Sequence, residues 1–293
     1  MSYLRKYGTI TLLILLLTSV MLRAQEKEVR EIKHKADETV YSQQFGKDVI
    51  RLLGNVILTH DDIVLTCDSA HLNQKLKILY GFSHVHMLKA DTIELYGDYL
   101  FYDGRAELVQ LDRHVKMVQK ESTLKTAHLS YNMKEETAWY YGGGQIVDSV
   151  NTIESRWGYY YPDLEKYHFK EKVFMSNEDL TLSTDTLFYN SKDNLVKFLG
   201  PTQIFGDTNY VYCESGWYDS DNNLSSFYQN ALFQAGDQVM EGDSLIYDRE
   251  NELFWAFGNV VARDTIQNSI INGEKLFYDE QIDRIQVTEE ALY

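Results

Sequence analysis

The sequence predicts an all-β protein, an elongated stack of about nine units of roughly 29 residues with two strands in each unit. Three observations support this fold class. A six-residue motif returns at a steady interval, two turn signals fall in every interval, and no segment shows the apolar period of an amphipathic helix. The composition agrees, because the 22 tyrosines favour strands and only 2 prolines interrupt the hydrogen-bonded ladders.

The motif consists of an acidic residue, a spacer, an apolar residue, a second spacer, Tyr, and then Asp or Asn, as in Asp98–Asp103. Its last residues follow one another at intervals of 28 to 31 residues. A fixed period of this length indicates a repeat architecture, in which each unit packs mainly against its neighbours. The nine copies, some of them loose, are Asp37–Ser42, Asp68–Asn73, Asp98–Asp103, Ala127–Asn132, Trp157–Pro162, Asp185–Asn190, Glu214–Asp219, Asp243–Asp248 and Glu274–Asp279.

Each unit contains two turn signals. One follows the motif directly, as at Asp103-Gly104, and the other falls half a period later, as at Ala90-Asp91. Asp, Asn and Gly favour turns because their side chains bond the local backbone or because they tolerate positive φ. Two turns per unit leave two strands of roughly 8–11 residues, which are rich in β-branched side chains, as in 63–66 and 115–118.

Alternation within the motif places its apolar residue and its Tyr on one face, which we expect to point inward, while spacers such as Tyr99 and Phe101 point outward. The stacked inward side chains fit either a filled core or an apolar groove for lipid chains. Two copies have Tyr159 and Gly216 in place of Leu, and there we expect the interior to change its width. The candidate groove residues are Leu100, Tyr102, Leu129, Tyr131, Leu187, Tyr189, Tyr218, Leu245, Tyr247, Leu276 and Tyr278.

The charge of the chain limits its partners. Acidic residues outnumber basic ones by 44 to 28, and the formal net charge is −16. Binding to nucleic acid or directly to an anionic membrane surface requires clustered Lys and Arg, so we expect neither. The hydrophobic content of 44% is that of a folded protein rather than of a disordered acidic tail.

Residues 1–24 have the features of a secretory signal peptide. Arg5-Lys6 precede an apolar run, and Ala24 ends a cleavage site. The apolar run Thr9–Leu22 has 14 residues, short of the roughly 20 that a membrane-spanning helix needs. We therefore expect cleavage and export, most simply to a bacterial periplasm, rather than an uncleaved anchor.

We expect a flexible lead-in over 25–35 and the repeat domain over 36–293. The sequence stops just as another unit would begin, so we expect either a longer native chain or a last strand edge that pairs with another chain. Cys67 and Cys213 lie five repeats apart, about 48 Å along such a stack. A disulfide needs Cα atoms within about 7 Å, so we predict none.

No catalytic motif is found, and we predict no enzyme activity, no metal site and no cofactor. The pair His84 and His86, with His114 one unit later, is more typical of a polar outer face than of a Zn²⁺ site. Gly142–Gly144 fits a bulge or corner rather than a phosphate loop. We interpret the acids at the first motif position as strand-end hydrogen bonding or solvation rather than as a ladder for divalent cations. These acids are Asp68, Asp98, Asp185, Glu214, Asp243 and Glu274.

The repeats resemble those of the OstA-like (organic-solvent-tolerance) family, which includes periplasmic bridge proteins of lipopolysaccharide transport. The resemblance is carried by Gly54-Asn55-Val56, Gly97–Asp103, Gly242–Asp248 and Gly258-Asn259-Val260. It implies an open, twisted β-jellyroll of stacked V-shaped strand pairs. It also implies an apolar groove for the acyl chains of lipopolysaccharide, and joining of modules through their sheet edges.

Taken together with the repeats and the signal peptide, the resemblance implies a non-enzymatic periplasmic scaffold of outer-membrane assembly that binds lipopolysaccharide. Its partners would be the acyl chains of lipid A and other transport proteins, or copies of itself. The alternative is an exported β-solenoid that binds or degrades polysaccharide. The first interpretation predicts that Asp at Leu100, Leu129, Leu187 or Leu245 abolishes lipid binding while the fold stays intact.

Overall fold

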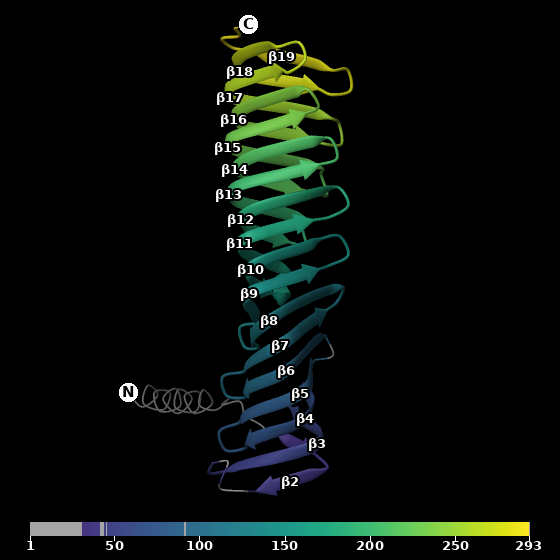
Figure 1. Ribbon diagram of the computed structural model, residues 1–293, viewed down its shortest axis with the longest axis vertical. Helices are drawn as coiled ribbons and strands as arrows, with labels where there is room; N and C mark the ends of the chain where they lie inside the picture. The colour runs from purple at the N-terminus through teal and green to yellow at the C-terminus, as the bar shows by residue number, and fades with distance from the viewer. Residues whose placement is uncertain (1–30, 42–43, 45, 91, 293) are drawn as a thin grey trace, which may run out of the picture. The chain divides into compact units, whose positions relative to one another are not determined.

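The computed structural model describes residues 31–41, 44, 46–90 and 92–292. These residues form a single 19-stranded antiparallel sheet, so the predicted fold class, a twisted jellyroll of stacked bent strand pairs, is confirmed. The strands follow one another along one long axis (Figure 1). The predicted signal peptide lies outside the described residues.

The strands are β1 (Lys33–Lys35), β2 (Glu38–Tyr41), β3 (Val49–His60), β4 (Ile63–Asn73), β5 (Ile78–Lys89), β6 (Ile93–Asp103), β7 (Leu108–Gln119), β8 (Ser122–Asn132), β9 (Thr137–Val147), β10 (Thr152–Tyr161), β11 (Lys166–Ser176), β12 (Leu180–Asn190), β13 (Leu195–Gly206), β14 (Asn209–Asp219), β15 (Leu224–Ala235), β16 (Gln238–Asp248), β17 (Leu253–Asp264), β18 (Ser269–Asp279) and β19 (Arg284–Thr288). A short 3₁₀ helix, η2 (Pro162–Leu164), connects β10 to β11.

Each strand from β2 to β19 pairs with the next one along the chain. β1 and β2 both pair with β3: Lys33–Lys35 lie beside residues 57–59, and Glu38–Tyr41 lie beside residues 50–53. Together they complete the first bent strand of the stack. The predicted lead-in over 25–35 needs a correction at its end. Within its described part, Lys33–Lys35 form a strand and Ile32 is 1% exposed, because this apolar side chain packs with the rest of the core.

The strands from β3 to β18 bend near their middle, where a bulge shifts the register between neighbours. At the bend of β17, Gly258 and Asn259 have φ angles of 71° and 50°. A Cβ on Gly258 would lie 2.5 Å from Oδ2 of Asp243, so a larger residue there would be strained and would displace the Asp243 side chain. The Gly-Asn-Val sequences therefore mark corners of the fold.

Each bend divides its strand between two sheet halves. The motif half contains the six-residue motifs, and the opposite half contains the other half of every strand. The turns that follow the motifs form the motif rim, and the turns half a period later form the opposite rim. The side between the two rims is called the mouth, and the corners lie on the other side.

Turns on the motif rim confirm the predicted hydrogen bonds. Oδ1 of Asp103 accepts hydrogen bonds from the backbone N–H groups of Arg105 and Ala106, at 2.9 and 3.0 Å. The fourth residue after the motif, Glu107, has a φ of 53°. Since the bonds are local, the motif itself determines where its strand ends. The same turn follows Asn132, Asn190, Asp219 and Asp248.

The core lies between the two halves. Leu100 and Tyr102 point inward and are 0% and 3% exposed. The spacers Tyr99 and Phe101 lie on the outer face and are half-buried. Alternation along the strand thus assigns the faces as the sequence predicts.

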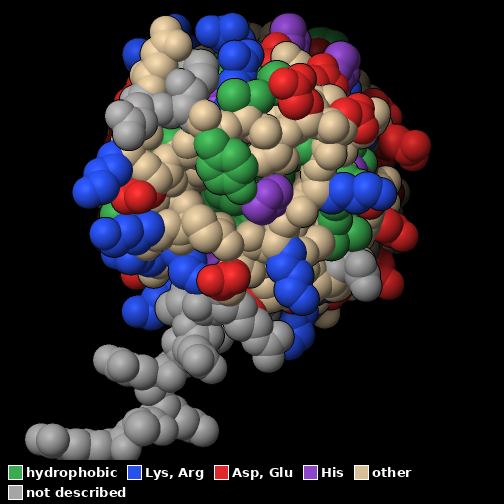
Figure 2. All heavy atoms as spheres, turned by 90° about the horizontal axis from the view of Figure 1, so that it is seen from below, with side chains coloured by type: hydrophobic (Ala, Val, Ile, Leu, Met, Phe, Trp, Pro, Cys, Tyr) green, Lys and Arg blue, Asp and Glu red, His purple; other side chains and the backbone are tan. Residues whose placement is uncertain are grey.

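Among the described residues, both ends of the stack are strand edges. One belongs to β1 and β2, where Lys33 and Lys35 are exposed. Figure 2 shows this end, with hydrophobic side chains and a histidine near its middle and charged side chains around them. The other edge belongs to β19, after which residues 289–290 take positive φ angles of 61° and 60°. Leu292 then bridges to Asn272 of β18, as in the opposite half of earlier units.

Candidate functional site

The predicted Leu/Tyr stripe lies on the inner face of the motif half. Its five leucines are 0–2% exposed. Four of its tyrosines are buried, whereas Tyr218 and Tyr247 are half-buried. The structure therefore brings the candidate residues onto one face, and their contact with lipid stays a prediction.

The burial of the leucines corrects one expectation. An Asp at Leu100, Leu187 or Leu245 would place a carboxylate where the native side chain is 0% exposed. Burying an unpaired charge costs several kcal/mol, roughly the stability of a small domain. Such substitutions would disrupt the fold itself. Over much of the stack the interior is filled by protein side chains.

The sequence interpretation missed the second wall of the interior. In the opposite half, the first and third residues after each corner point inward, as Val85 and Met87 do at 1% exposure each. The same pattern recurs at Val115 and Met117. Its signal was the apolar residue that follows most corners, which includes the Val of the Gly-Asn-Val sequences.

Motif tyrosines connect the two rims in the first two thirds of the stack. The hydroxyl of Tyr102 lies 2.5 Å from Nδ1 of His60, and Nζ of Lys89 donates to the hydroxyl of Tyr131 at 3.4 Å. Nδ2 of Asn151 donates to the hydroxyl of Tyr189, also at 3.4 Å. The paired residues are 38 to 42 positions apart, because the twist brings each motif opposite a turn from more than one unit earlier.

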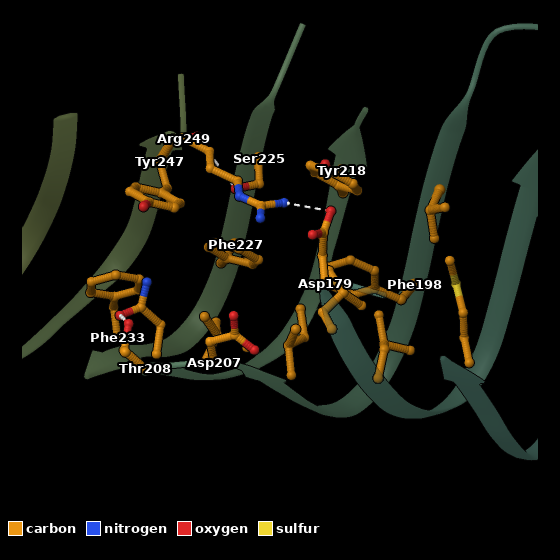
Figure 3. A pocket seen from close by; sticks show the side chains of 18 of the residues that line it. Asp179, Phe198, Asp207, Thr208, Tyr218, Ser225, Phe227, Phe233, Tyr247 and Arg249 are labelled. Carbon is orange, nitrogen blue, oxygen red and sulfur yellow. Dashed lines mark hydrogen bonds and ion pairs between the residues drawn. The ribbon is translucent and has the colours of Figure 1, made fainter. Parts of the chain in front are cut away.

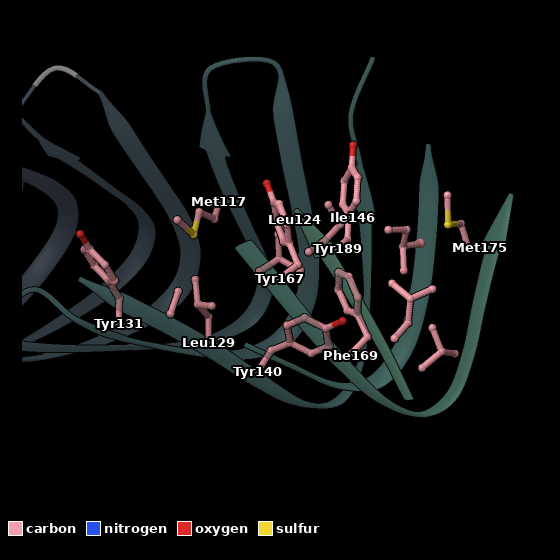
Figure 4. Close-up of a cluster of buried hydrophobic side chains, with 14 of the residues drawn as sticks. Met117, Leu124, Leu129, Tyr131, Tyr140, Ile146, Tyr167, Phe169, Met175 and Tyr189 are labelled. Carbon is pink, nitrogen blue, oxygen red and sulfur yellow. The ribbon is translucent and has the colours of Figure 1, made fainter. Parts of the chain in front are cut away.

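Burial raises the pKa of Tyr102 and of Tyr189, so both hydroxyls stay protonated at neutral pH. In Figure 4 the hydroxyl groups of Tyr167 and Tyr189 are directed away from the bottom of the curved strands. Tyr167 lies in β11 and donates to Oγ of Ser122 at 3.4 Å. These hydrogen bonds close the mouth above the buried leucines.

A cavity of about 370 Å³ lies farther along, lined by residues of β11 to β16 and by Arg249, Glu252 and Glu280 of the motif rim. Its floor contains the rings of Phe198, Phe227 and Phe233. Figure 3 shows Tyr218 and Tyr247 on one side of the cavity, with Phe227 between them and the opposite rim. No hydrogen bond between described residues connects either tyrosine directly to the opposite rim, so the mouth is wider here.

Ser225 explains the position of this cavity. Cross-strand pairing places Val196, Tyr218, Ser225, Tyr247 and Phe254 in one row across five strands. In this row, the neighbouring odd-numbered strands β13 and β17 carry the apolar side chains of Val196 and Phe254, whereas β15 carries only the small hydroxyl side chain of Ser225. The missing volume leaves a gap between the two half-buried tyrosines.

The unit with Gly216 borders this cavity, as expected, but Gly216 does not create it. A Cβ there would lie 2.5 Å from a ring carbon of Phe198, which therefore fills the space. In the unit that has Tyr159 in place of Leu, a Cβ on the preceding residue, Gly158, would lie 2.2 Å from the ring of Tyr140. Tyr140 therefore fills that part of the interior, so the unit with Tyr159 narrows it rather than opening it.

One ion pair crosses the mouth above the cavity. Nη1 of Arg249, on the motif rim, lies 3.1 Å from Oδ2 of Asp179, on the opposite rim (Figure 3). The hydrogen bond lowers the pKa of Asp179 and raises that of Arg249. Nearby, Tyr247 donates to Oε2 of Glu280 at 3.3 Å, and burial raises the pKa of this carboxyl group.

Acids at the first motif position bond to the corners, in agreement with the hydrogen-bonding interpretation. Nδ2 of Asn259 donates to Oδ2 of Asp243 at 2.9 Å, and Nδ1 of His84 lies 2.7 Å from Oδ2 of Asp68. The residues in each pair are 16 positions apart. Within the described ranges, no group of three potential ligands is placed to hold a metal ion.

Both cysteines are buried free thiols. Burial raises the pKa of Cys67 to about 11 and that of Cys213 to about 12. Neither thiol is therefore a reactive nucleophile at neutral pH.

Among the described residues, no helix has the length and apolar composition that crossing a membrane requires. No curated protein sequence matches the chain. Among solved structures, a match is found to LptH from Pseudomonas aeruginosa, described as the LptA-homologous periplasmic component of the conserved lipopolysaccharide transport device. The match has a TM-score of 0.33 and 18% identity, and it covers 37% of this chain and 80% of that chain.

A sequence model of the OstA-like protein family matches residues 28–185 and 164–238 of this chain. The two matches together span most of the stack, including the motif tyrosines that join the rims and the turns at Asp103 and Asp219. The chain therefore belongs to the OstA-like protein family.

Proposed function

We propose that this protein is a non-enzymatic periplasmic scaffold that carries lipopolysaccharide during outer-membrane assembly. The observation that carries the proposal is an apolar interior that runs along the stack and widens at the phenylalanine floor formed by β13 and β15. Membership of the OstA-like family supports the same function. Transfer of an alkyl chain from water to such a surface is favourable by about 0.8 kcal/mol per CH₂ group.

Acyl chains would enter through the mouth, where Tyr218 and Tyr247 are half-buried and Phe233 lies below them. A tyrosine suits this position, since its ring contacts apolar groups and its hydroxyl remains close to water. The sugars of the lipid would remain outside the mouth. The protein would act passively, as a surface along which the lipid moves.

Neighbouring components would dock at the ends of the stack. The edges of β1, β2 and β19 carry backbone groups that another strand can pair with. Pairing there would continue the two sheet halves, and with them the interior, from one protein into the next. The partner would be a second copy of this chain or another transport protein.

A photo-crosslinking amino acid in place of Tyr247 tests the lipid function. In cells we expect it to capture lipopolysaccharide. The same amino acid in place of Phe188, which is 38% exposed on the outer face, is the matched control and should capture none. Capture at neither position, with both variants folded and exported, would contradict the proposal.

A second function is favoured by the outer face of the motif half. Tyr141 is 44% exposed and lies 5.8 Å from the ring of Trp157, and the rings of His168 and Phe188 stack at 4.2 Å. Exposed aromatic faces of this kind suit the stacking of sugar rings. We therefore retain polysaccharide binding as the alternative. Titration with soluble glycans, compared with Trp157→Ala, would measure it.

A further inference from the structure

The cavity lined by β11 to β16 has the size and lining of a ligand site. It measures about 370 Å³, whereas two other cavities among the described residues measure about 10 Å³ each. Small-molecule sites usually measure about 300–1,000 Å³ and are mostly apolar with a few polar groups. Here Phe198, Phe227 and Phe233 provide an apolar floor, and charged side chains stand at the mouth.

Charge around this mouth is predominantly negative. The described lining residues include four carboxylates, those of Asp179, Asp207, Glu252 and Glu280, and the single guanidinium of Arg249. Arg249 is compensated by Asp179 at 3.1 Å. Within the described part of the chain, no salt bridge compensates the other three carboxylates.

Glu280 is the most constrained of these carboxylates. Tyr247 donates to its Oε2 at 3.3 Å, but its Oε1 is buried without a hydrogen-bond partner among the described residues. Burial, and to a smaller extent the charge of Glu252, raises its pKa. A buried acceptor without a partner is costly, and a positive charge beside it would stabilise the ionised form of this carboxyl group.

We propose that this cavity binds single-chain amphiphiles whose head group is positively charged. The alkyl tail lies on the floor formed by Phe198, Phe227 and Phe233, and the head group lies beside Glu280 and Glu252. A negatively charged head group finds, among the described lining residues, one cation, Arg249, and must displace Asp179 to reach it while facing three uncompensated carboxylates.

The inference goes beyond the proposed function and does not depend on it. It concerns the head group at one mouth, whereas the proposed function concerns acyl chains in the interior. The uncompensated carboxylates at this mouth would repel the phosphates of a bound lipopolysaccharide, so those phosphates would lie away from it. Crosslinking of lipopolysaccharide in cells and head-group preference in vitro are separate measurements, so either proposal can fail alone.

Three probes with the same tail test the inference: dodecyltrimethylammonium, dodecyl maltoside and dodecyl sulfate. Binding to the exported chain is measured by calorimetry, below the concentrations at which the probes form micelles and at fixed ionic strength. We expect the cationic probe to bind roughly tenfold more tightly than the anionic one, with the neutral probe between them. Equal or tighter binding of the anionic probe overturns the inference.

Variants locate the binding. Glu280→Gln should reduce the cationic preference several-fold, whereas Glu250→Gln, an exposed acid on the same rim outside the cavity lining, should leave it unchanged. Ser225→Phe fills the gap between Tyr218 and Tyr247 and should weaken binding of all three probes; Ser225→Leu serves if the larger residue prevents folding. Equal effects of the two Gln variants, or no effect of filling the cavity, would place the binding elsewhere and refute the inference.

Discussion

Asp179 and Arg249 are separated by 70 positions in the sequence, yet their side chains meet at 3.1 Å across the mouth of the jellyroll. The two residues belong to turns on opposite rims, and the widest part of the interior lies beneath them. In the units nearer the N-terminus, hydrogen bonds to the hydroxyl groups of motif tyrosines join the two rims instead. An exposed ion pair is weaker and more easily displaced than those buried bonds.

Breaking this ion pair should open the cavity at little cost in stability. The side chains of Asp179 and Arg249 are 57% and 43% exposed, so Arg249→Ala should lower the free energy of unfolding by less than about 1 kcal/mol. A cysteine in place of Ser225 should nevertheless react faster with a thiol reagent in the Ala variant. The native cysteines do not interfere, because both are buried with raised pKa values.

The charge-exchanged double variant Asp179→Arg with Arg249→Asp provides the control for this experiment. It should restore slow labelling at position 225, since the pair is re-formed with its charges interchanged. Fast labelling in the exchanged variant would mean that the ion pair does not restrict the mouth.

Removal of the Tyr102 hydroxyl should destabilise the closed part of the stack. Tyr102→Phe leaves Nδ1 of His60, whose side chain is 5% exposed, without its partner at 2.5 Å. We expect a loss of about 1–3 kcal/mol in the free energy of unfolding, measured by chemical denaturation. Tyr80→Phe, on the outer face at 37% exposure, should change it by less than about 0.5 kcal/mol. Equal losses in the two variants would contradict a bridging role.

A methyl group at Gly216 should not be tolerated. It would lie 2.5 Å from both a ring carbon of Phe198 and the carbonyl oxygen of Ser226, so Gly216→Ala should destabilise the protein by about 1–3 kcal/mol. Gly81→Ala is the matched control, because the nearest atom, Sγ of Cys67, would lie at an ordinary 3.6 Å. Thermal unfolding of both variants measures the difference, and a neutral Gly216→Ala would show that Phe198 moves freely.

The corner at His84 should depend on pH. The hydrogen bond to Asp68 raises the pKa of His84, so the folded state favours the protonated imidazole. This contribution to stability is fully present below the pKa of the unfolded chain and is lost as the pH rises through the raised pKa of the folded state. In an NMR titration, Asp68→Asn should lower the pKa of His84. An unchanged midpoint would remove Asp68 as the cause.

Much of the fold follows from local patterns, which is why the sequence predicts it. The interval between motifs defines the units, the side chain of Asp103 forms its turn with residues two and three positions away, and alternation directs Leu100 inward. Each of these features depends on neighbours within a few positions, so a single unit contains the information.

The wider site depends on contacts that no single unit contains. Tyr102 bonds to His60 and Arg249 to Asp179 because the twist of the sheet shifts one rim past the other, and the size of that shift is not encoded in the motif. The cavity likewise results from Ser225 in a row shared by five strands. The repeat, the turns and the inward face can be read from the local pattern of residues. Where the interior is closed, where it opens, and which charges lie at the opening depend on how distant units meet across the twisted sheet.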